Sequence, residues 1–208
     1  MTSVSPLVIR PARSDDDAEV ARLYEICLRT GAAGSDATVQ YTDPKLLGHV
    51  YVGPYLAYRS KLAFVLADAA DVPQGYVLGV ADTYEFEQQL AEQWWPALRS
   101  WYPRDSYPAG TADGGVVGLI HGWKPTPEVV LADYPAHLHI DLLPAAQGGG
   151  NGRRLLEHLL DELLARGVGG VHLGVDAENE RAIGFYRHLG FTPLDVSGAS
   201  GLMGLRLA

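Results

Sequence analysis

The sequence has little of three things that mark whole classes of protein. Cys27 is the only cysteine, so the chain can build neither an intrachain disulfide nor a cysteine-based zinc cluster. No apolar run approaches the roughly 20 residues that span a bilayer, and the first residues show no basic segment followed by a hydrophobic signal core. Positive charge is also scarce, with 16 Lys and Arg against 25 Asp and Glu. We therefore expect a cytoplasmic protein with neither a membrane nor a nucleic acid as partner.

The composition that is present suits one folded domain. The chain has 208 residues, and its hydrophobic content of 47% is enough to bury a core. A net charge of −9 would steer a cationic substrate favourably. Residues 83–133 differ from the rest, because all four tryptophans and five prolines fall there. We interpret that stretch as an insertion within a single domain of residues 1–208.

The hydrophobic periodicity predicts a mixed α/β order. Residues 7–10 read as a strand, Ser14 and Asp17 as a capping box, and the following helix stops at Gly31. Asp43 and Pro44 are expected to open a second helix. The remaining predicted elements are strands at 63–66 and 76–80, a strand at 136–142, a helix at 153–166, a strand at 171–175, a helix at 179–189 and a closing strand at 202–207. Strand, helix, strand, helix in the second half implies a βαβ crossover.

A glycine-rich loop between a predicted strand and a leucine-striped helix is the most informative stretch. It runs from Gln147 to Gly152 and is followed by Arg153 and Arg154. Glycines let backbone amides converge, and the helix N-terminus adds partial positive charge, so the loop suits a pyrophosphate. A flexible turn is the plain alternative. Neither a Walker loop nor a dinucleotide fingerprint fits, because Leu155 stands where the latter needs its third glycine.

The loop and a second motif together resemble the GNAT superfamily of N-acetyltransferases. Gln147, Gly150 and Gly152 match the family's Gln/Arg-x-x-Gly-x-Gly/Ala loop, and Asn179, Ala182 and Tyr186 match its Asn-x-x-Ala-x-x-x-Tyr helix. The resemblance covers residues 134–193 closely. It implies a central mixed twisted β-sheet flanked by helices, with the Trp/Pro-rich stretch as an insertion. Within the superfamily, residues 134–141 resemble bacterial relatives of the acetyltransferase-like C-terminal domain of eukaryotic O-GlcNAcase.

The resemblance also implies roles for individual residues. Acetyl-CoA would be the co-substrate and no metal would be needed. The backbone of residues 140–143 would pair with the pantetheine arm, and an amide near Ile140 or Leu142 would polarise the thioester carbonyl. Tyr186 would protonate the leaving thiolate as general acid. The residues implied to bind the cofactor are Ile140, Leu142, Leu143, Gln147, Gly148, Gly149, Gly150, Asn151, Gly152, Arg153, Asn179, Ala182, Phe185 and Tyr186.

The sequence does not identify the general base. A lysine-like amine is almost fully protonated at pH 7, so a proton acceptor or a water relay is expected. The candidates are Asp82, Glu85, His121, His137, His139 and Asp141, of which Asp141, His139 and Glu85 join Tyr186 in our catalytic set. In an extended strand the last two histidines share one face with Asp141. A satisfied buried hydrogen-bond network is the alternative for that face, and a metal site has no recognisable third ligand.

Three hypotheses for function remain. They are an amine N-acetyltransferase that works by direct attack in a ternary complex, an acyl-CoA-binding domain without catalysis, and a protein-interaction module. The acceptor would be a small-molecule or protein amine, and the oligomeric state is left as monomer or homodimer. The four tryptophans and the tyrosines at 51, 55 and 58 either line the acceptor cleft or form core.

Overall fold

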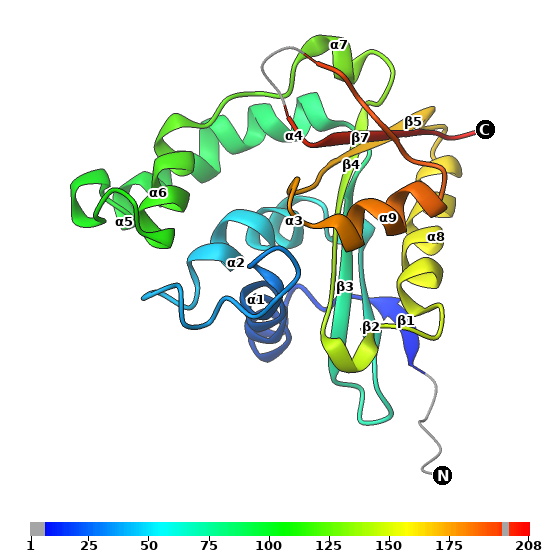
Figure 1. Ribbon diagram of the computed structural model, residues 1–208, viewed down its shortest axis with the longest axis horizontal. Helices are drawn as coiled ribbons and strands as arrows, with labels where there is room; N and C mark the ends of the chain where they lie inside the picture. The colour runs from blue at the N-terminus through cyan, green and yellow to red at the C-terminus, as the bar shows by residue number, and fades with distance from the viewer. Residues whose placement is uncertain (1–6, 197–199) are drawn as a thin grey trace.

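The computed structural model describes residues 7–196 and 200–208. Its seven-stranded sheet has the order β1-β2-β3-β4-β5-β7-β6, which places β4 at the centre (Figure 1). The pair β4 and β5 is parallel, and the neighbouring pairs are antiparallel, so the sheet is mixed. The strands are β1 (Val8–Pro11), β2 (Ala63–Ala67), β3 (Pro73–Val80), β4 (Ala136–Leu142), β5 (Gly170–Gly174), β6 (Thr192–Pro193) and β7 (Leu202–Arg206).

Helices cover both faces of this sheet. The α-helices are α1 (Asp17–Thr30), α2 (Leu46–Tyr51), α3 (Gly53–Tyr58), α4 (Thr83–Gln89), α5 (Trp95–Trp101), α6 (Ala112–Gly122), α7 (Glu128–Leu131), α8 (Asn151–Leu164) and α9 (Glu180–His188). Short turns of other helix types are η1 (Ser60–Leu62), η2 (Leu90–Trp94, a π-helical turn), η3 (Arg104–Ser106) and η4 (Pro144–Ala146). In Figure 1, α1 and α8 lie on opposite sides of the strands.

The two faces of the sheet form two hydrophobic clusters. Along β3, Tyr76 and Leu78 pack with α1 to α6, whereas Val77 between them packs with α8 and α9. This is the alternation that a β-strand imposes on its side chains. Helix α8 adds four fully buried leucines to its cluster, at 155, 156, 159 and 163, each contributing roughly 1.5–3 kcal/mol relative to an exposed side chain. Gly79 lets α8 approach β3, because a Cβ there would lie 2.5 Å from Leu159 Cδ1.

Strands β4 and β5 are joined only at their start. The register pairs Ala136 with Val171 and His137 with His172, and the pairing ends there although β4 continues to Leu142. Over that remainder β4 stays paired with β3, up to Leu142 opposite Gly75. The two strands therefore diverge in the middle of the sheet, and a gap opens beside the second half of β4.

Most elements lie where the sequence predicts them, and the corrections concern their ends. The helix α1 is capped by Asp16, whose carboxylate accepts from the amides of Ala18 and Glu19, and not by Ser14. The side chain of Asp43 accepts from the Lys45 amide, so this turn precedes α2 instead of forming its first residues. The two-residue strand β6 and the helix α3 were not predicted. For α1, two nearby residues could serve as the N-cap, and β6 and α3 are too short to leave a clear pattern in the sequence.

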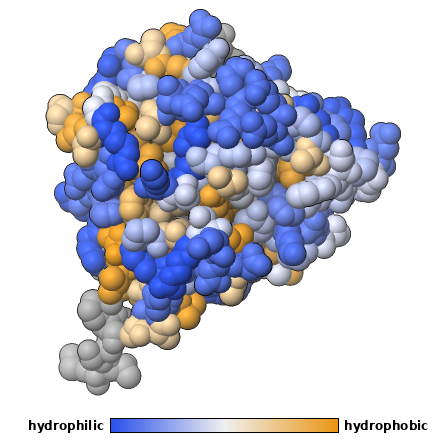
Figure 2. Space-filling view, turned by 180° about the vertical axis from the view of Figure 1, so that it is seen from behind, coloured by the Kyte–Doolittle hydropathy of each residue, from blue (hydrophilic) through white to orange (hydrophobic). Residues whose placement is uncertain are grey.

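Residues 83–133, which we interpret as an insertion, are largely helical. They run through α4, the π-helical turn η2, α5, α6 and α7, and in Figure 1 α5 and α6 extend to the side of the sheet that α1 and α2 cover. Asp82 caps α4 by accepting from the Glu85 amide. The face seen from behind is mostly hydrophilic, with hydrophobic residues in several small patches (Figure 2). Among the described residues, no helix combines the length and the apolar character required to cross a membrane.

Candidate functional site

The gap between β4 and β5 opens into a cleft of about 810 Å³, here called cavity 1. The second half of β4 forms one wall with Ile140, Asp141 and Leu142, and the glycine loop, α9 and the loop after α1 form the others. Successive peptide groups of a strand face opposite edges. Because Leu143 N–H donates to Gln74 O on the β3 side at 2.9 Å, the amides of Leu142 and Ile140 face the gap. Two backbone donors therefore border this cleft.

The glycine loop takes a conformation that few other residues could adopt. Gly148, Gly149 and Gly150 have φ values of 82°, 58° and 77°, in the left-handed region that glycine enters without strain. Gly150 caps α8, so the amides of the first helical turn have no partner within the helix. Gln147 fixes the loop to β4, because its Nε2 donates to Leu142 O at 2.8 Å. The Asn151 amide donates to Gly148 O at 3.2 Å, which leaves the amides of Gly152 and Arg153 without a partner among the described residues, the arrangement that binds phosphates.

Helix α9 brings the second motif to the opposite wall. The side chain of Asn179 caps the helix through Oδ1, which accepts from the Ala182 amide at 3.0 Å, and its Nδ2 lies toward Gly34. A Cβ on Gly152 would lie 3.5 Å from the Phe185 ring, so α9 lies close to the first turn of α8. Tyr186 is 8% exposed and borders cavity 1. Burial, with a smaller effect from Asp141, raises the pKa of the Tyr186 hydroxyl above its usual value of 10.0.

The polar face of β4 carries three groups with different environments. His137 uses both ring nitrogens, with Tyr55 Oη at 2.8 Å and Thr83 Oγ1 at 2.8 Å, so it is a satisfied structural residue. Burial lowers its pKa well below 6.5. Asp141 accepts from Tyr76 Oη at 2.6 Å, and burial raises the pKa of this carboxyl. Burial, and next His172, lowers the pKa of His139 to about 4, so its ring is neutral at pH 7.

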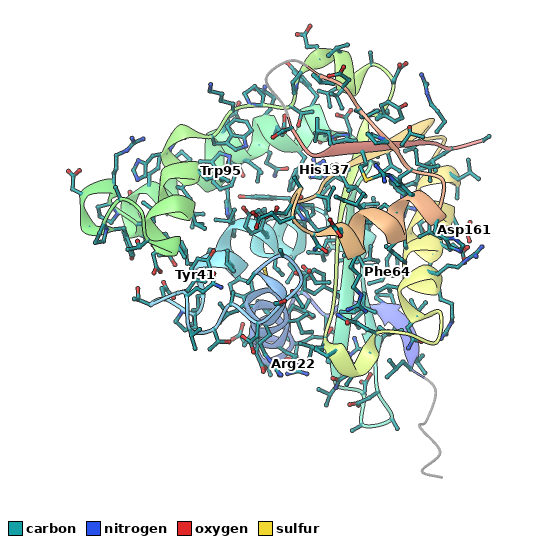
Figure 3. All side chains as sticks on the ribbon, viewed as in Figure 1. Arg22, Tyr41, Phe64, Trp95, His137 and Asp161 are labelled. Carbon is teal, nitrogen blue, oxygen red and sulfur yellow. The ribbon has the colours of Figure 1, made fainter. Side chains whose placement is uncertain are left out.

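A second hollow, of about 260 Å³ and here called cavity 2, lies on the α1 side of the sheet at the point where the strands diverge. His139 borders it, and Ile140, the next residue along β4, borders cavity 1. The rest of its wall includes Tyr55 from α3 and Trp95 from the helical segment 83–133. Figure 3 shows His137 on the central strand and Trp95 on the helices beside it. The two cavities therefore border adjacent residues of β4, His139 in cavity 2 and Ile140 in cavity 1.

The structure brings most of the predicted site residues together. Those that border cavity 1 are Ile140, Asp141, Leu142, Gln147, Gly148, Gly150, Asn151, Gly152, Arg153, Asn179, Ala182, Phe185 and Tyr186. His139 borders cavity 2 instead.

Three predicted site residues lie elsewhere. The side chain of Leu143 packs in the α1-side core and its amide faces β3, because one step along a strand reverses both. Gly149 is exposed at the tip of the loop. The side chain of Glu85 is 73% exposed at the surface, with one oxygen 3.3 Å from Arg59, so it borders neither cavity. Of the other base candidates, Asp82 caps α4 and His121 contacts Tyr102 O at 2.9 Å.

Some residues of the site carry no signal in the sequence. Thr30 at the end of α1 and Ala33, Gly34 and Ser35 in the loop after it border cavity 1, although a loop of small residues resembles any other turn. His172 borders cavity 2, and its Nδ1 lies 2.8 Å from Tyr134 O. Only the sheet register, which sets His172 beside His137, reveals its place.

Comparisons with known proteins agree with this geometry. A model of the Acetyltransferase (GNAT) family matches residues 79–191. The chain belongs to the GNAT acetyltransferase family. A crystal structure named SsHAT superposes with a TM-score of 0.86 at 41% identity, over 98% of this chain and 99% of that one. The finer resemblance to bacterial relatives of the O-GlcNAcase domain stays a prediction.

Two curated acetyltransferases align with shorter stretches of this chain. Mycothiol acetyltransferase of Beutenbergia cavernae is 37% identical over 111 residues, which are 53% of this chain and 34% of that protein. The bS18-alanine N-acetyltransferase of Escherichia coli is 47% identical over 62 residues, 30% of this chain and 42% of that enzyme. The matches thus span less than half of either relative. The first enzyme is named for mycothiol and the second for an alanine of ribosomal protein bS18, so their names point to acceptors of different kinds.

Proposed function

We propose that this GNAT protein is an acetyl-CoA-dependent N-acetyltransferase that transfers the acetyl group directly to an amine within a ternary complex. The observation that carries the proposal is the pair of cavities that meet at the divergence of β4 and β5. One is large enough for a nucleotide and its arm, since ligand sites commonly measure about 300–1,000 Å³. The other borders the adjacent residue of the same strand. Such an arrangement suits two substrates that must meet.

In this proposal cavity 1 holds the acyl donor. The free amides of the glycine loop and of the first turn of α8 bind the pyrophosphate. The Nδ2 of Asn179, whose Oδ1 is occupied by the helix cap, remains able to donate to the pantetheine. The amides of Ile140 and Leu142 face the gap, where one of them stabilises the negative charge that develops on the thioester oxygen.

The amine approaches from cavity 2 beside His139. Transfer forms one N–C bond and breaks one C–S bond, the sulfur keeps the bonding electron pair, and the nitrogen loses a proton. His139 is neutral at pH 7, and its ring nitrogens make no hydrogen bond to the described part of the chain, so it is the group we assign to receive that proton. Asp141, on the same face of β4 but bordering cavity 1, is the second group able to take it up.

Tyr186 is better suited to donate a hydrogen bond than to give up its proton. A thiol has a pKa near 8.5, whereas burial holds the pKa of the Tyr186 hydroxyl above 10. Net proton transfer from this hydroxyl to the departing thiolate is therefore uphill. A hydrogen bond to the charged sulfur still stabilises it, by about 1.5–3 kcal/mol.

The test is amine-dependent release of the CoA thiol, with the acetylated product identified by mass spectrometry. We expect thiol release above the rate of spontaneous hydrolysis with at least one amine class, and one acetyl group on the product. Binding of acetyl-CoA without transfer to any amine would contradict the enzyme and support the non-catalytic acyl-CoA binder. A lack of binding would contradict both.

A further inference from the structure

Aromatic and histidine rings, several of which contact one another, make up about half of the lining of cavity 2. Tyr55 lies edge-on to His139, with ring centroids 5.3 Å apart, and tilted against Phe86 at 5.0 Å. On the helical segment, Trp95 and Trp123 lie 6.0 Å apart with their planes only 35° from parallel. All five residues border the cavity. The cavity therefore offers ring faces and edges from two sides, the surfaces that aromatic guests prefer.

The wall of cavity 2 carries little charge, and its charged group is already hydrogen-bonded. Glu87 is the one charged side chain among the described residues that border cavity 2. Its carboxylate accepts from the Thr126 amide at 3.0 and 3.1 Å and from Thr126 Oγ1 at 2.7 Å. The two histidines that flank the β4 end, His137 and His172, use ring nitrogens for protein hydrogen bonds. Among the described residues that border cavity 2, no free anionic group is therefore available to pair with an alkylammonium ion beside His139, where the amine must react.

The volume of cavity 2 restricts the size of its ligand. A hollow of 260 Å³ equals the liquid volume of about nine water molecules, at roughly 30 Å³ each. One benzene-sized ring with its amine and one or two substituents has about that many non-hydrogen atoms. A lysine side chain brings only five beyond Cα and would leave much of the aromatic wall without contact.

We propose that cavity 2 is the acceptor pocket and that its substrate is a small aromatic primary amine, held between the tyrosine and tryptophan walls with its nitrogen beside His139. This inference rests on the proposed function, because it needs the acyl donor in cavity 1. The nitrogen lone pair attacks the thioester carbon, the C–S electron pair stays on sulfur, and the nitrogen proton passes to His139. An amine attached directly to a ring is uncharged at neutral pH, so it meets this wall without desolvating a charge.

The experiment compares kcat/KM for four kinds of acceptor at a fixed saturating concentration of acetyl-CoA. They are amines bonded directly to a ring, ring amines with a one- or two-carbon linker, linear alkylamines of equal atom count, and a lysine-containing peptide. We expect at least a tenfold preference for one or both ring classes over the other two, and the two ring arms distinguish the directly bonded source from the linked one. A linear amine or the peptide as the preferred acceptor would overturn the inference.

Wall variants test the location of the acceptor. Trp123→Ala removes one ring face and should lower kcat/KM for ring amines about tenfold or more, with acetyl-CoA affinity unchanged. Trp101→Ala is the matched control, because Trp101 is 62% exposed and lies outside cavity 2. Leu119→Trp changes an exposed rim residue and should reduce turnover of two-ring amines more than that of one-ring amines. If Trp123→Ala and Leu119→Trp both kept the kinetics of wild type, the acceptor would bind elsewhere.

The same measurements separate this inference from the proposed function. Calorimetry that detects acetyl-CoA binding, together with transfer only to non-aromatic amines, overturns the acceptor class and leaves the acetyltransferase intact. Absence of acetyl-CoA binding overturns the proposed function itself.

Discussion

At the scale of single residues, a Tyr186 variant distinguishes an enzyme from a protein that only binds acetyl-CoA. Tyr186→Phe removes the hydroxyl and keeps the ring that packs 5.6 Å from Phe191, so the fold should survive. Loss of a hydrogen bond to a thiolate predicts a kcat about 10- to 100-fold lower, with less than a fivefold change in the Kd of acetyl-CoA. Steady-state kinetics and calorimetry on both proteins measure the two quantities. An unchanged kcat would remove Tyr186 from the mechanism.

His139 carries the second prediction at this scale. General-base catalysis contributes typically 10²- to 10⁴-fold, and a base with a pKa of about 4 belongs at the lower end. His139→Gln should therefore lower kcat about 100-fold or somewhat less, without weakening acetyl-CoA binding. Asp141→Asn is the matched comparison on the same face of β4. If the Asp141 variant loses more activity than the His139 variant, the proton acceptor is the carboxylate.

At the scale of elements, the loop between β4 and α8 depends on its left-handed glycines. Gly150 has a φ of 77°, and a Cβ there would meet no atom within 4 Å. Gly150→Asn should fold with a cost of about 1 kcal/mol, because asparagine tolerates this region, and should bind acetyl-CoA within tenfold of wild type. Gly150→Glu adds a carboxylate beside the proposed pyrophosphate site. Two like charges about 4 Å apart repel by about 4 kcal/mol near a surface, so affinity should fall at least a hundredfold.

The contrast between these two variants is the check on the loop. Both place a side chain on the left-handed backbone of residue 150, at a smaller cost for asparagine, and only glutamate adds a negative charge. Equal affinities for acetyl-CoA in calorimetric titrations would show that the phosphates bind elsewhere.

The elements that the sequence predicts well are those with strong local signals. Helix α8 is recognisable from its leucine stripe and glycine cap, and β4 from its alternation, so most of the cavity 1 residues could be named beforehand. The misplacement of Leu143 was avoidable in principle, since period-two alternation turns it away from Leu142.

Cavity 2 could not be predicted in the same way. Tyr55 lies in α3, Trp95 in α5 and Trp123 just after α6, and only the packing of residues 83–133 against α3 and β4 makes them neighbours. The sequence left open whether these rings were core or cleft, because both uses require the same residue types. Long-range packing decides between them, and several of these rings in fact belong to the core cluster while also bordering the cavity.

At the scale of the whole molecule, the buried histidines predict acid sensitivity. Burial lowers the pKa values of His137, His139 and His172 in the folded protein relative to 6.5. The unfolded chain therefore binds more protons, and the stabilisation present above pH 6.5 is lost as the pH falls. For His139 the loss runs from 6.5 to about 4 and amounts to at most about 3 kcal/mol.

The measurement is the free energy of unfolding from pH 7 to pH 4.5 for wild type and His139→Gln. The variant should show the weaker dependence on pH. A dependence identical to that of wild type would mean that His139 titrates normally in the folded state.

The most direct test of the account is calorimetric titration of the whole protein with acetyl-CoA, beside a thermal melt with and without it. We predict a Kd in the micromolar range at one site per chain. At a hundredfold excess over Kd the ligand should add about 2.7 kcal/mol to stability, a rise in Tm of roughly 5–10 °C. No heat of binding and no shift in Tm at millimolar acetyl-CoA would contradict the assignment of cavity 1, and with it the acetyltransferase.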